Sequence, residues 1–343
     1  MAILVTGAAG FIGYHVTRAL LASGESVVGI DNLNPYYDPR LKEDRLAALE
    51  ATKTGAFRFL RVDFSDHEAL DRALDNAEID RIVHLGAQAG VRYSIDNPRA
   101  YVSANLAGHL NMLETARNRG VAHFVYASSS SVYGSNDRLP FSVEDRVDHP
   151  VSLYAATKKA DELISETYAH LYRIPSTGLR FFTVYGPWGR PDMAMWIFTR
   201  KILAGEPIRV FNHGRMRRDF TFIDDIVAGI IACLHAPPPD DGQVKAGGSI
   251  APHRLYNIGN NRSEELMHMI ALLESACGRK AQVELLPMQP GDVPETWADI
   301  GPIRAEMGFE PRTPIDIGVP RFVDWYKQYQ KDRTAAGDAR RGV

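Results

Sequence analysis

The sequence predicts an α/β fold built on a doubly wound parallel sheet, followed by a smaller C-terminal α/β substrate lobe. Short apolar runs alternate with amphipathic segments over 1–185, which is typical of repeated strand-helix-strand crossovers. After Tyr185-Gly186-Pro187 this pattern loosens into shorter elements separated by Gly, Pro and Arg. The 343 residues also exceed the ~250–300 at which one hydrophobic core usually stops growing, so a second lobe is expected.

The apolar runs of the first lobe predict strands near 2–6, 26–30, 57–62, 81–85, 122–128 and 176–181. The substrate lobe is predicted over 186–330. This prediction includes the possibility that the chain crosses back to the first lobe within that range. Its expected elements are helices near 194–204, 223–236, 263–277 and 316–332 and strands near 208–211 and 254–258. Residues 237–252 hold three consecutive prolines and three glycines, which predicts an exposed loop. The polar end, 331–343, is predicted to be a flexible tail.

The composition excludes several classes of function. A charged fraction of 24% and a formal net charge of -3 describe an ordinary globular protein and give no support to nucleic-acid binding. No apolar stretch approaches the ~20 residues that cross a bilayer, and the chain starts directly on a strand, so no membrane association and a cytoplasmic location are expected. Cys233 and Cys277 lie in apolar helical patterns and are interpreted as buried small hydrophobes. The eleven histidines show no ligand spacing, so no metal is expected.

A glycine loop follows the first strand. The run Thr6-Gly7-Ala8-Ala9-Gly10-Phe11-Ile12-Gly13 opens the first helix. In that context the glycines let the backbone approach a pyrophosphate at the positive end of the helix. A tight strand-to-helix turn is the alternative, but the context favours a Rossmann-type dinucleotide site formed by Gly7, Gly10, Phe11, Ile12 and Gly13.

Two acidic residues follow the next two strands. Asp31 comes 18 residues after Gly13, where a carboxylate accepts hydrogen bonds from the adenosine ribose and repels a 2′-phosphate. The cofactor is therefore predicted to be NAD and not NADP, with Asn32 beside it. Asp63 and the adjacent Phe64 end the third strand. Asp63 either contacts the adenine amino group or caps the next helix, and both interpretations stay open.

The fourth strand ends in Leu85-Gly86-Ala87, whose small side chains suit close packing against a cofactor. Asn105 lies on the following helix within a mostly apolar face. A buried amide needs hydrogen-bond partners. Asn105 therefore either holds neighbouring backbone or touches the cofactor region.

The spacing Tyr154-Ala155-Ala156-Thr157-Lys158 places a phenol and an ammonium on one face of a helix. The cation favours the phenolate, so the pair predicts a base for hydride transfer at a carbinol. Hydroxyls at the end of the fifth strand, including Ser129, lie at the sheet edge where ligands bind.

The glycine loop, Ser129, and Tyr154 with Lys158 together resemble the extended short-chain dehydrogenase/reductase family, from Ile3 to about Tyr326. The resemblance implies that these three residues are catalytic. Family members that are 4,6-dehydratases carry an acidic pair, and many that are decarboxylases a glutamate, just before the V-Y-G turn. Here those positions are Ser130 and Ser131. Serines serve poorly as the general acid and base of a dehydration, so epimerisation is the expected reaction.

The stretches 31–42 and 180–193 closely resemble UDP-glucuronate 4-epimerases. That likeness implies reversible epimerisation of UDP-glucuronate to UDP-galacturonate at C4, through a 4-keto intermediate and with bound NAD. Arg190 is the candidate for gripping the sugar carboxylate, because guanidinium binds carboxylates in a bidentate manner. Thr183 and Ser130 are assigned to the sugar, and Arg92 is a weaker carboxylate candidate. Alternatively Arg190 contacts the diphosphate or pairs with Asp192.

The substrate lobe supplies the remaining candidates. By resemblance, Phe211 packs on the uracil and Arg218 neutralises the diphosphate. Gln289 and Asp292 are further candidates for binding the substrate. Phe211 as ordinary core, and arginines 215 and 217 as a solvated face, are the alternatives.

Two other functions stay open. One is a 4-epimerase of neutral UDP-hexoses such as UDP-glucose, or of both acidic and neutral sugars. The other is a non-catalytic nucleotide-sensing protein, which the presence of Ser129, Tyr154 and Lys158 disfavours. Helical patterns near 97–118 and 152–172 resemble the four-helix interface of the family, which implies a homodimer.

Overall fold

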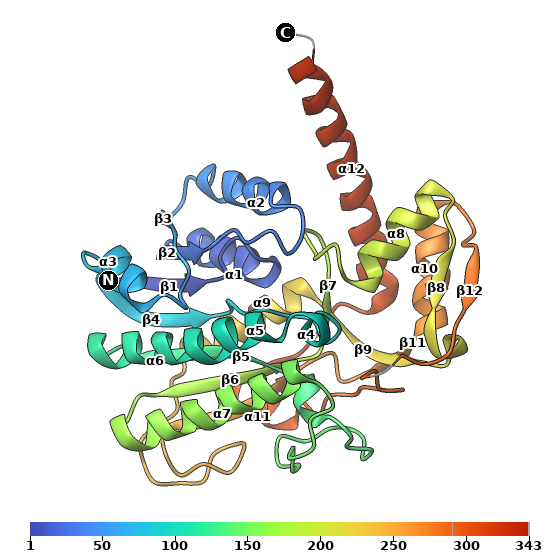
Figure 1. Ribbon diagram of the computed structural model, residues 1–343. Coiled ribbons are helices and arrows are strands. Elements are labelled where there is room, and N and C mark those ends of the chain that lie inside the picture. Colours follow the sequence, from blue (N-terminus) through green and yellow to red (C-terminus); the bar gives the residue numbers. More distant parts are fainter. Residues whose placement is uncertain (290, 342–343) are drawn as a thin grey trace.

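The central sheet organises the first lobe (Figure 1). The computed structural model describes residues 1–289 and 291–341. Seven parallel strands lie in the order β10-β6-β5-β4-β1-β2-β3. They are β1 (Ala2–Thr6), β2 (Ser26–Asp31), β3 (Ala56–Arg61), β4 (Ile79–His84), β5 (His123–Ser129), β6 (Ser176–Phe181) and β10 (His253–Ile258). The predicted doubly wound fold is confirmed, and its order reverses between β1 and β4, where such sheets bind ligands.

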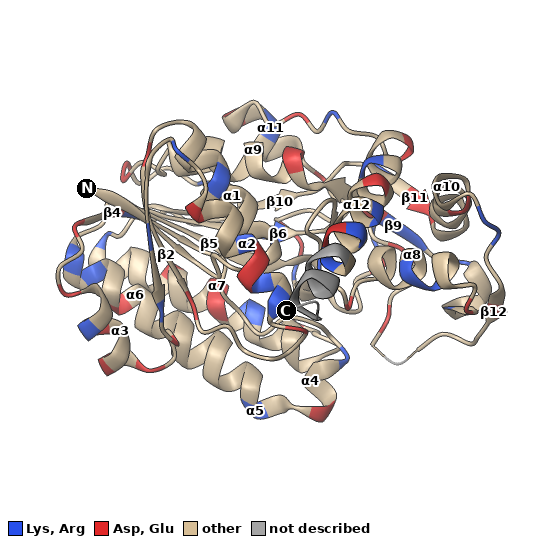
Figure 2. Cartoon of the chain, turned by 90° about the horizontal axis from the view of Figure 1, so that it is seen from above, with Lys and Arg blue, Asp and Glu red and all other residues tan. Residues whose placement is uncertain are grey.

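Helices cover both faces of this sheet (Figure 2). On one face α1 (Phe11–Ala22) contacts α2 (Arg40–Glu50) and α9 (Ile223–Leu234). On the other face α6 (Gly108–Arg119) contacts α3 (His67–Leu74) and α7 (Leu153–Tyr172). Leu4 and Val5, adjacent on β1, point to opposite faces and are both fully buried. That double burial explains why the strands read as continuous apolar runs.

Between β4 and α6 the chain forms three short elements. They are α4 (Tyr93–Asp96), α5 (Pro98–Tyr101) and a π-helix, η1 (Val102–Ala107). The sequence predicted one helical pattern over 97–118. A 3-10 turn, η2 (Ser130–Tyr133), follows β5.

The second lobe holds two small sheets. One joins β7 (Thr183–Tyr185), β9 (Arg217–Phe222) and β11 (Ser263–Glu265), and the other joins β8 (Ile208–Val210) and β12 (Val283–Leu285). Its helical elements are α8 (Ala194–Ala204), η3 (Phe211–Gly214), α10 (Leu266–Cys277) and α12 (Ile315–Arg341), while α11 (Gly301–Met307) contacts β10 and α9.

Four elements differ from the sequence-based prediction. The helix assigned to the second lobe near 223–236 is α9, which packs beside α1 over the central sheet. The strand assigned to the second lobe near 254–258 is β10, which pairs with β6 and returns the chain to the central sheet. The helix expected from 263 begins at Leu266, because Ser263–Glu265 first pairs with β9. The structure continues α12 to Arg341, where a tail was predicted over 331–343, and 342–343 lie outside the described residues.

Among the described residues there are two buried hydrophobic clusters, and one of them spans both lobes. A single cluster includes Val5 on β1, Trp196 on α8 and Phe322 on α12. Trp188 links the lobes, with its ring centroid 5.3 Å from that of Tyr14 and 5.4 Å from that of Trp325. This continuous packing holds the second lobe against the carboxyl edge of the sheet.

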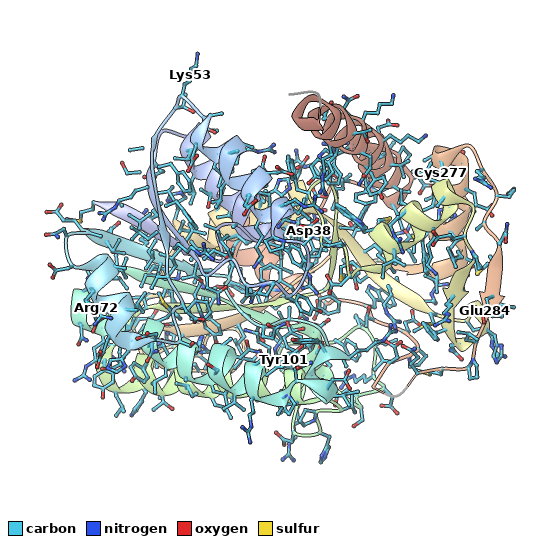
Figure 3. All side chains as sticks on the ribbon, turned by 45° about the horizontal axis from the view of Figure 1, so that its top comes forward. Asp38, Lys53, Arg72, Tyr101, Cys277 and Glu284 are labelled. Carbon is cyan, nitrogen blue, oxygen red and sulfur yellow. The ribbon has the colours of Figure 1, made fainter. Side chains whose placement is uncertain are left out.

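The two cysteines are free. Cys233 is buried in α9, and Cys277 is half-buried at the end of α10, in the second lobe (Figure 3). Among residues 1–289 and 291–341, no helix combines the length and apolarity of a membrane span. Within the same range, no group of three or more His, Cys, Asp or Glu side chains is arranged to hold a metal ion.

Candidate active site

The glycine loop turns tightly onto the first helix. Gly7 has φ +66°, in the left-handed region that favours glycine. A Cβ atom on Gly13 would lie 2.0 Å from the carbonyl oxygen of Gly7, so no other residue fits there. Helix α1 begins at Phe11, and its first N–H groups have no intrahelical partners. The loop therefore has the close backbone approach and the positive helix end that bind a pyrophosphate.

A cavity of about 260 Å³ opens beside this loop. It is formed at the carboxyl ends of β1, β2, β4 and β5, together with α7 and the segment after β7. Its lining includes these residues predicted for the cofactor: Gly7, Gly10, Phe11, Ile12, Gly13, Asp31, Asn32, Asp63, Phe64, Leu85, Ala87, Tyr154 and Lys158. The topology thus brings together motifs that are more than 150 residues apart.

Asp31 and Asp63 lie at one end of the cavity. Asp31 accepts a hydrogen bond from the backbone N–H of Leu33, and its Oδ1 lies 3.5 Å from the Nζ atom of Lys42. Asp63 accepts a 2.8 Å hydrogen bond from Asn32. Burial alone would raise the pKa of Asp63, but hydrogen bonds from neighbouring residues lower it. Asp63 does not cap the next helix, because that position belongs to Asp66.

Asn105 does not line the cavity. It is buried on η1, accepts a hydrogen bond from the backbone N–H of Gln88, and donates to the carbonyl oxygen of Gln88 and to Thr157 Oγ1. Asn105 thus holds the backbone of Gln88, which does line the cavity, while its contact with the cofactor stays a prediction. Of the two roles that the sequence left open, the structure shows the first.

Ser129, Tyr154 and Lys158 all line the cavity. Ser129 ends β5, and Tyr154 lies in the first turn of α7, whose N-terminus is capped by the hydroxyl of Ser152. Ser129 Oγ donates to Ser131 Oγ at 3.1 Å. Tyr154 therefore lies in the first turn of α7 and shares the cavity with the hydroxyl of Ser129.

Lys158 is anchored inside the protein. Its Nζ atom donates to the carbonyl oxygen of Ala127 at 2.9 Å and to Asp161 Oδ2 at 3.0 Å. The side chains of Lys158 and Asp161 are 3% and 0% exposed. Burial raises the pKa of Asp161 to about 6, although the ammonium of Lys158 acts to lower it. The sequence analysis did not single out Asp161.

Arg190 lines the cavity and is paired with an acidic residue. Its Nε and Nη2 atoms donate to Asp192 at 3.0 and 2.5 Å, and Tyr36 donates to the same carboxylate at 3.0 Å. Burial and the Asp192 carboxylate raise the pKa of Tyr36 to about 12. The pairing with Asp192 was one alternative from the sequence. It does not bar a second carboxylate, because Arg190 keeps further N–H donors.

The second-lobe candidates form a separate cluster. Asp292 lies 3.5 Å from guanidinium nitrogens of both Arg92 and Arg218. The guanidinium of Arg92 also covers the ring of Phe211, 5.0 Å from its centroid. The Oε1 atom of Gln289 is buried and has no hydrogen-bond partner among the described residues. Two arginines, an aromatic face and a carboxylate therefore meet in one cluster, and none of the four residues lines the cavity that holds Tyr154.

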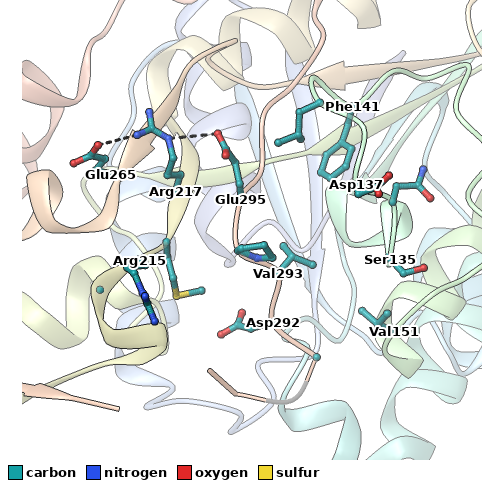
Figure 4. A pocket seen from close by; sticks show the side chains of 17 residues that line it. Ser135, Asp137, Phe141, Val151, Arg215, Arg217, Glu265, Asp292, Val293 and Glu295 are labelled. Carbon is teal, nitrogen blue, oxygen red and sulfur yellow. Dashed lines mark hydrogen bonds and ion pairs between the residues drawn. The ribbon is translucent and has the colours of Figure 1, made fainter. Parts of the chain in front are cut away.

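A larger cleft of about 830 Å³ lies against this cluster (Figure 4). Asp292 and Val293 form part of its wall, opposite Ser135 and Asp137. In it Arg217 pairs with Glu265 and Glu295, marked by the dashed lines in Figure 4, as expected of a solvated face.

Three residues predicted for the sugar, Arg92, Ser130 and Thr183, line neither cavity. Ser130 begins η2, directly after Ser129, and Thr183 begins β7 between the lining residues Phe182 and Val184. Ser130 and Thr183 are therefore sequence neighbours of residues that line the cavity. The sequence analysis missed Tyr36 and Lys42, which do line the cavity. Both stood in the stretch 31–42 that carried the resemblance, and only their tertiary contacts reveal them.

Comparisons with known proteins agree with this geometry. The model of the NAD dependent epimerase/dehydratase family matches residues 3–259. A probable UDP-glucuronate 4-epimerase of Rhizobium meliloti is 49% identical, over 97% of this chain and 99% of that protein.

Two solved structures share the fold. The UDP-glucuronic acid 4-epimerase of Bacillus cereus, in complex with UDP-glucuronic acid and NAD, has a TM-score of 0.83 at 33% identity, covering 96% of this chain and 100% of that one. The UDP-glucose 4-epimerase of Thermotoga maritima, with UDP-glucose, has a TM-score of 0.83 at 28% identity and the same coverage. With the family model matching most of the chain, this protein belongs to the NAD dependent epimerase/dehydratase family.

Proposed function

We propose that this protein interconverts UDP-glucuronate and UDP-galacturonate by inverting the C4 carbon of the sugar. The observation that carries the proposal is one cavity lined by Ser129, Tyr154, Lys158 and Arg190 together. The Rhizobium and Bacillus relatives named for this activity support the same choice.

The residues present fit NAD as the cofactor. The Gly7–Gly13 turn admits a pyrophosphate, and Asp31 stands where ribose hydroxyls bind and a 2′-phosphate is repelled. Lys158 has one N–H left for a ribose after its bonds to Ala127 and Asp161. When bound, NAD supplies the reversible hydride acceptor that oxidation and re-reduction at C4 require.

Tyr154 and Ser129 handle the proton. Tyr154, as phenolate, accepts the proton of the C4 hydroxyl, and Lys158 stabilises that phenolate. Ser129 hydrogen-bonds the C4 oxygen and relays the proton when the hydroxyl occupies its other orientation. After the 4-keto sugar has turned over, the proton of Tyr154 returns to the C4 oxygen, and C4 then has the opposite configuration.

Arg190 recognises the acid. The oxidised sugar of a glucuronate is a β-keto acid, which loses CO2 if its carboxylate is released from a stabilising cation. Arg190 binds that carboxylate and keeps its charge localised. The hydroxyl of Thr183, a sequence neighbour of lining residues, assists, while Ser130 is the weaker assignment because it leaves β5 to begin η2.

The nucleotide is anchored by the cluster in the second lobe. Phe211 offers an apolar face for uracil once the guanidinium of Arg92 moves from it. Arg218 neutralises the diphosphate, while Gln289 and Asp292 hold the nucleoside by hydrogen bonds. This anchor lets the sugar alone turn over between the two half-reactions.

A 4-epimerase of neutral UDP-hexoses is the second candidate. It is favoured by Asp192, which offsets the charge of Arg190, and by the similarity to the Thermotoga UDP-glucose enzyme. Incubation of purified protein with UDP-glucuronate and UDP-glucose, separately and without added NAD, followed by sugar analysis, decides between them. Formation of UDP-galacturonate supports the proposal, whereas turnover of UDP-glucose alone would refute it.

We also propose that the protein forms a homodimer through α6 and α7. Leu110, Leu163 and Leu171 on these helices are 41%, 57% and 60% exposed. Replacing Leu163 by Glu should halve the mass measured by light scattering, and an unchanged mass would reject this interface. A cytoplasmic location stays a prediction that cell fractionation tests.

A further inference from the structure

A buried carboxylate without an assigned role lies behind the cavity. Asp161 is one helical turn after Lys158 on α7, and its Oδ2 accepts the 3.0 Å hydrogen bond from the ammonium. Asp161 does not line either cavity, so it touches neither substrate nor cofactor. Any effect on the reaction must act through its contact with Lys158 or through the electrostatic field of its charge.

The surroundings of Asp161 are poor in compensating groups. Its Oδ1 atom has no hydrogen-bond partner among the described residues. A buried carboxylate with a single ionic partner is costly to keep, since desolvation can exceed the attraction between the ions. An aspartate kept at such a site needs an explanation beyond packing.

The adjacent Glu162 provides a contrast. It accepts hydrogen bonds from Arg180, Lys159 and Ser128, and its charge is therefore fully compensated. Burial would raise the pKa of Glu162, but Arg180 holds it below its usual value. The pair of Glu162 and Arg180 is a closed structural unit that ties α7 to β6.

The other titratable groups packed around the Lys158–Asp161 pair are neutral. Burial lowers the pKa of His84, on β4, to about 3 and that of His109, on α6, well below its usual value. Burial also raises the pKa of Tyr126, on β5, well above its usual value. Glu162 already has Arg180 and Lys159 as cationic partners. Asp161 is therefore the anion near Lys158 that has Lys158 as its cationic partner.

We propose that Asp161 is a positioning residue that fixes the Lys158 ammonium and offsets part of its charge, and so sets the pH above which Tyr154 acts as a base. This inference rests on the proposed roles of Tyr154 and Lys158. Together with the carbonyl oxygen of Ala127, the Asp161 carboxylate holds two of the three ammonium N–H groups of Lys158 and directs the third to the cavity. Asp161 lies seven residues after Tyr154, about 10 Å along the helix, close enough for its charge to oppose the phenolate.

The variant Asp161→Asn tests this proposal because it keeps the shape and removes the charge. We expect the acidic limb of the kcat profile of the holoenzyme with UDP-glucuronate to move to lower pH by about one unit. A second measurement needs no turnover: the tyrosinate absorbance step that Tyr154→Phe removes should move in the same direction.

The matched control is Glu166→Gln, which removes a carboxylate from the same helix farther from Tyr154. Glu166 lies about 18 Å from Tyr154 along the helix axis, so the pH shift caused by Glu166→Gln should be less than half of that caused by Asp161→Asn. If Asp161→Asn does not fold, Asp161→Ser removes the same charge with a smaller side chain.

An acidic limb and an absorbance step that stay in place, or that move to higher pH, would overturn the role of Asp161 even if its replacement changed stability. Failure of the parent protein to convert UDP-glucuronate would instead reject the proposed function. The absorbance measurement would still decide the effect of Asp161 in that case.

Discussion

The carboxylate of Asp192 occupies the guanidinium fork of Arg190, with Oδ1 3.0 Å from Nε and Oδ2 2.5 Å from Nη2. Arg190 is the arginine that lines the cavity with Tyr154. The cation proposed to recognise a uronate is thus already paired with an anion of the same chain. Substrate choice should depend on both partners.

Replacing Arg190 by Ala should lower kcat/KM for UDP-glucuronate roughly 10- to 100-fold, because charge-assisted hydrogen bonds to the carboxylate are lost. The loss on UDP-glucose should be much smaller. Steady-state kinetics on both substrates check this, and equal losses would remove the carboxylate assignment. The variant should also release more CO2 per turnover than the parent enzyme.

Replacing Asp192 by Asn should shift preference toward the acid. Without the Asp192 charge, Arg190 attracts a uronate more strongly and a nearby anion no longer repels it. We expect the ratio of kcat/KM for UDP-glucuronate over UDP-glucose to rise roughly tenfold. Tyr36→Phe, which removes a hydrogen bond to Asp192 but no charge, is the control and should leave the ratio nearly unchanged.

Replacing Tyr154 by Phe should reduce turnover roughly 10²- to 10⁴-fold, because the general base is lost. Binding of UDP, measured by calorimetry, should be unaffected, since the nucleotide cluster lies elsewhere. A protein that only senses nucleotides would show the same binding and no catalytic loss to measure. Undiminished turnover would show that another group takes the C4 proton.

A deuterium atom at C4 of UDP-glucuronate should be retained in UDP-galacturonate. The proposed reaction removes the hydrogen of C4 as hydride and returns the same atom to the other face. A hydrogen that moves between carbon atoms does not exchange with water. Mass spectrometry of the product in ordinary water checks this. Loss of the label to solvent would point to inversion by proton abstraction.

Stability should fall as the pH falls from 7 toward 5.5. Burial lowers the pKa of four histidines: His15 to about 4, His84 and His123 to about 3, and His109 well below its usual value. The unfolded chain takes up protons near pH ~6.5, so stability is complete above that value and is lost below it. At pH ~5.5 each histidine costs roughly 1 kcal/mol.

Two carboxyl groups act in the opposite direction. Burial raises the pKa of Asp161 and Asp219 to about 6, so the folded state gains stability as they take up protons. Two groups offset only part of the effect of four histidines. Melting temperatures measured between pH 7 and 5.5 check the combined effect of the histidines and carboxyl groups. His123→Gln, far from the cavity, should make the melting temperature depend less on pH. A melting temperature that rises on acidification would contradict this sign.

Most of the residues that the sequence predicted for the cofactor line one cavity, because the sequence signals behind them are local. Gly7, Gly10 and Gly13 are fixed by a turn between one strand and one helix, and Tyr154 and Lys158 by one helical turn. Such spacings survive without knowledge of the rest of the chain. The apolar helical pattern around Asn105 predicts that its amide is buried. The same pattern does not reveal its hydrogen-bond partners, Gln88 and Thr157, which are distant in the sequence.

By itself the sequence determined the parallel sheet, the dinucleotide loop and the Tyr-Lys pair, because helix and strand periods and backbone sterics act over a few residues. Only the tertiary structure decided that β10 returns to the central sheet, that Asp192 fills the fork of Arg190, and that Asp161 lies behind Lys158. Those relations depend on which buried charges and strand edges find partners once the lobes pack together. Desolvation makes unpaired charges costly, so the folded arrangement selects their partners.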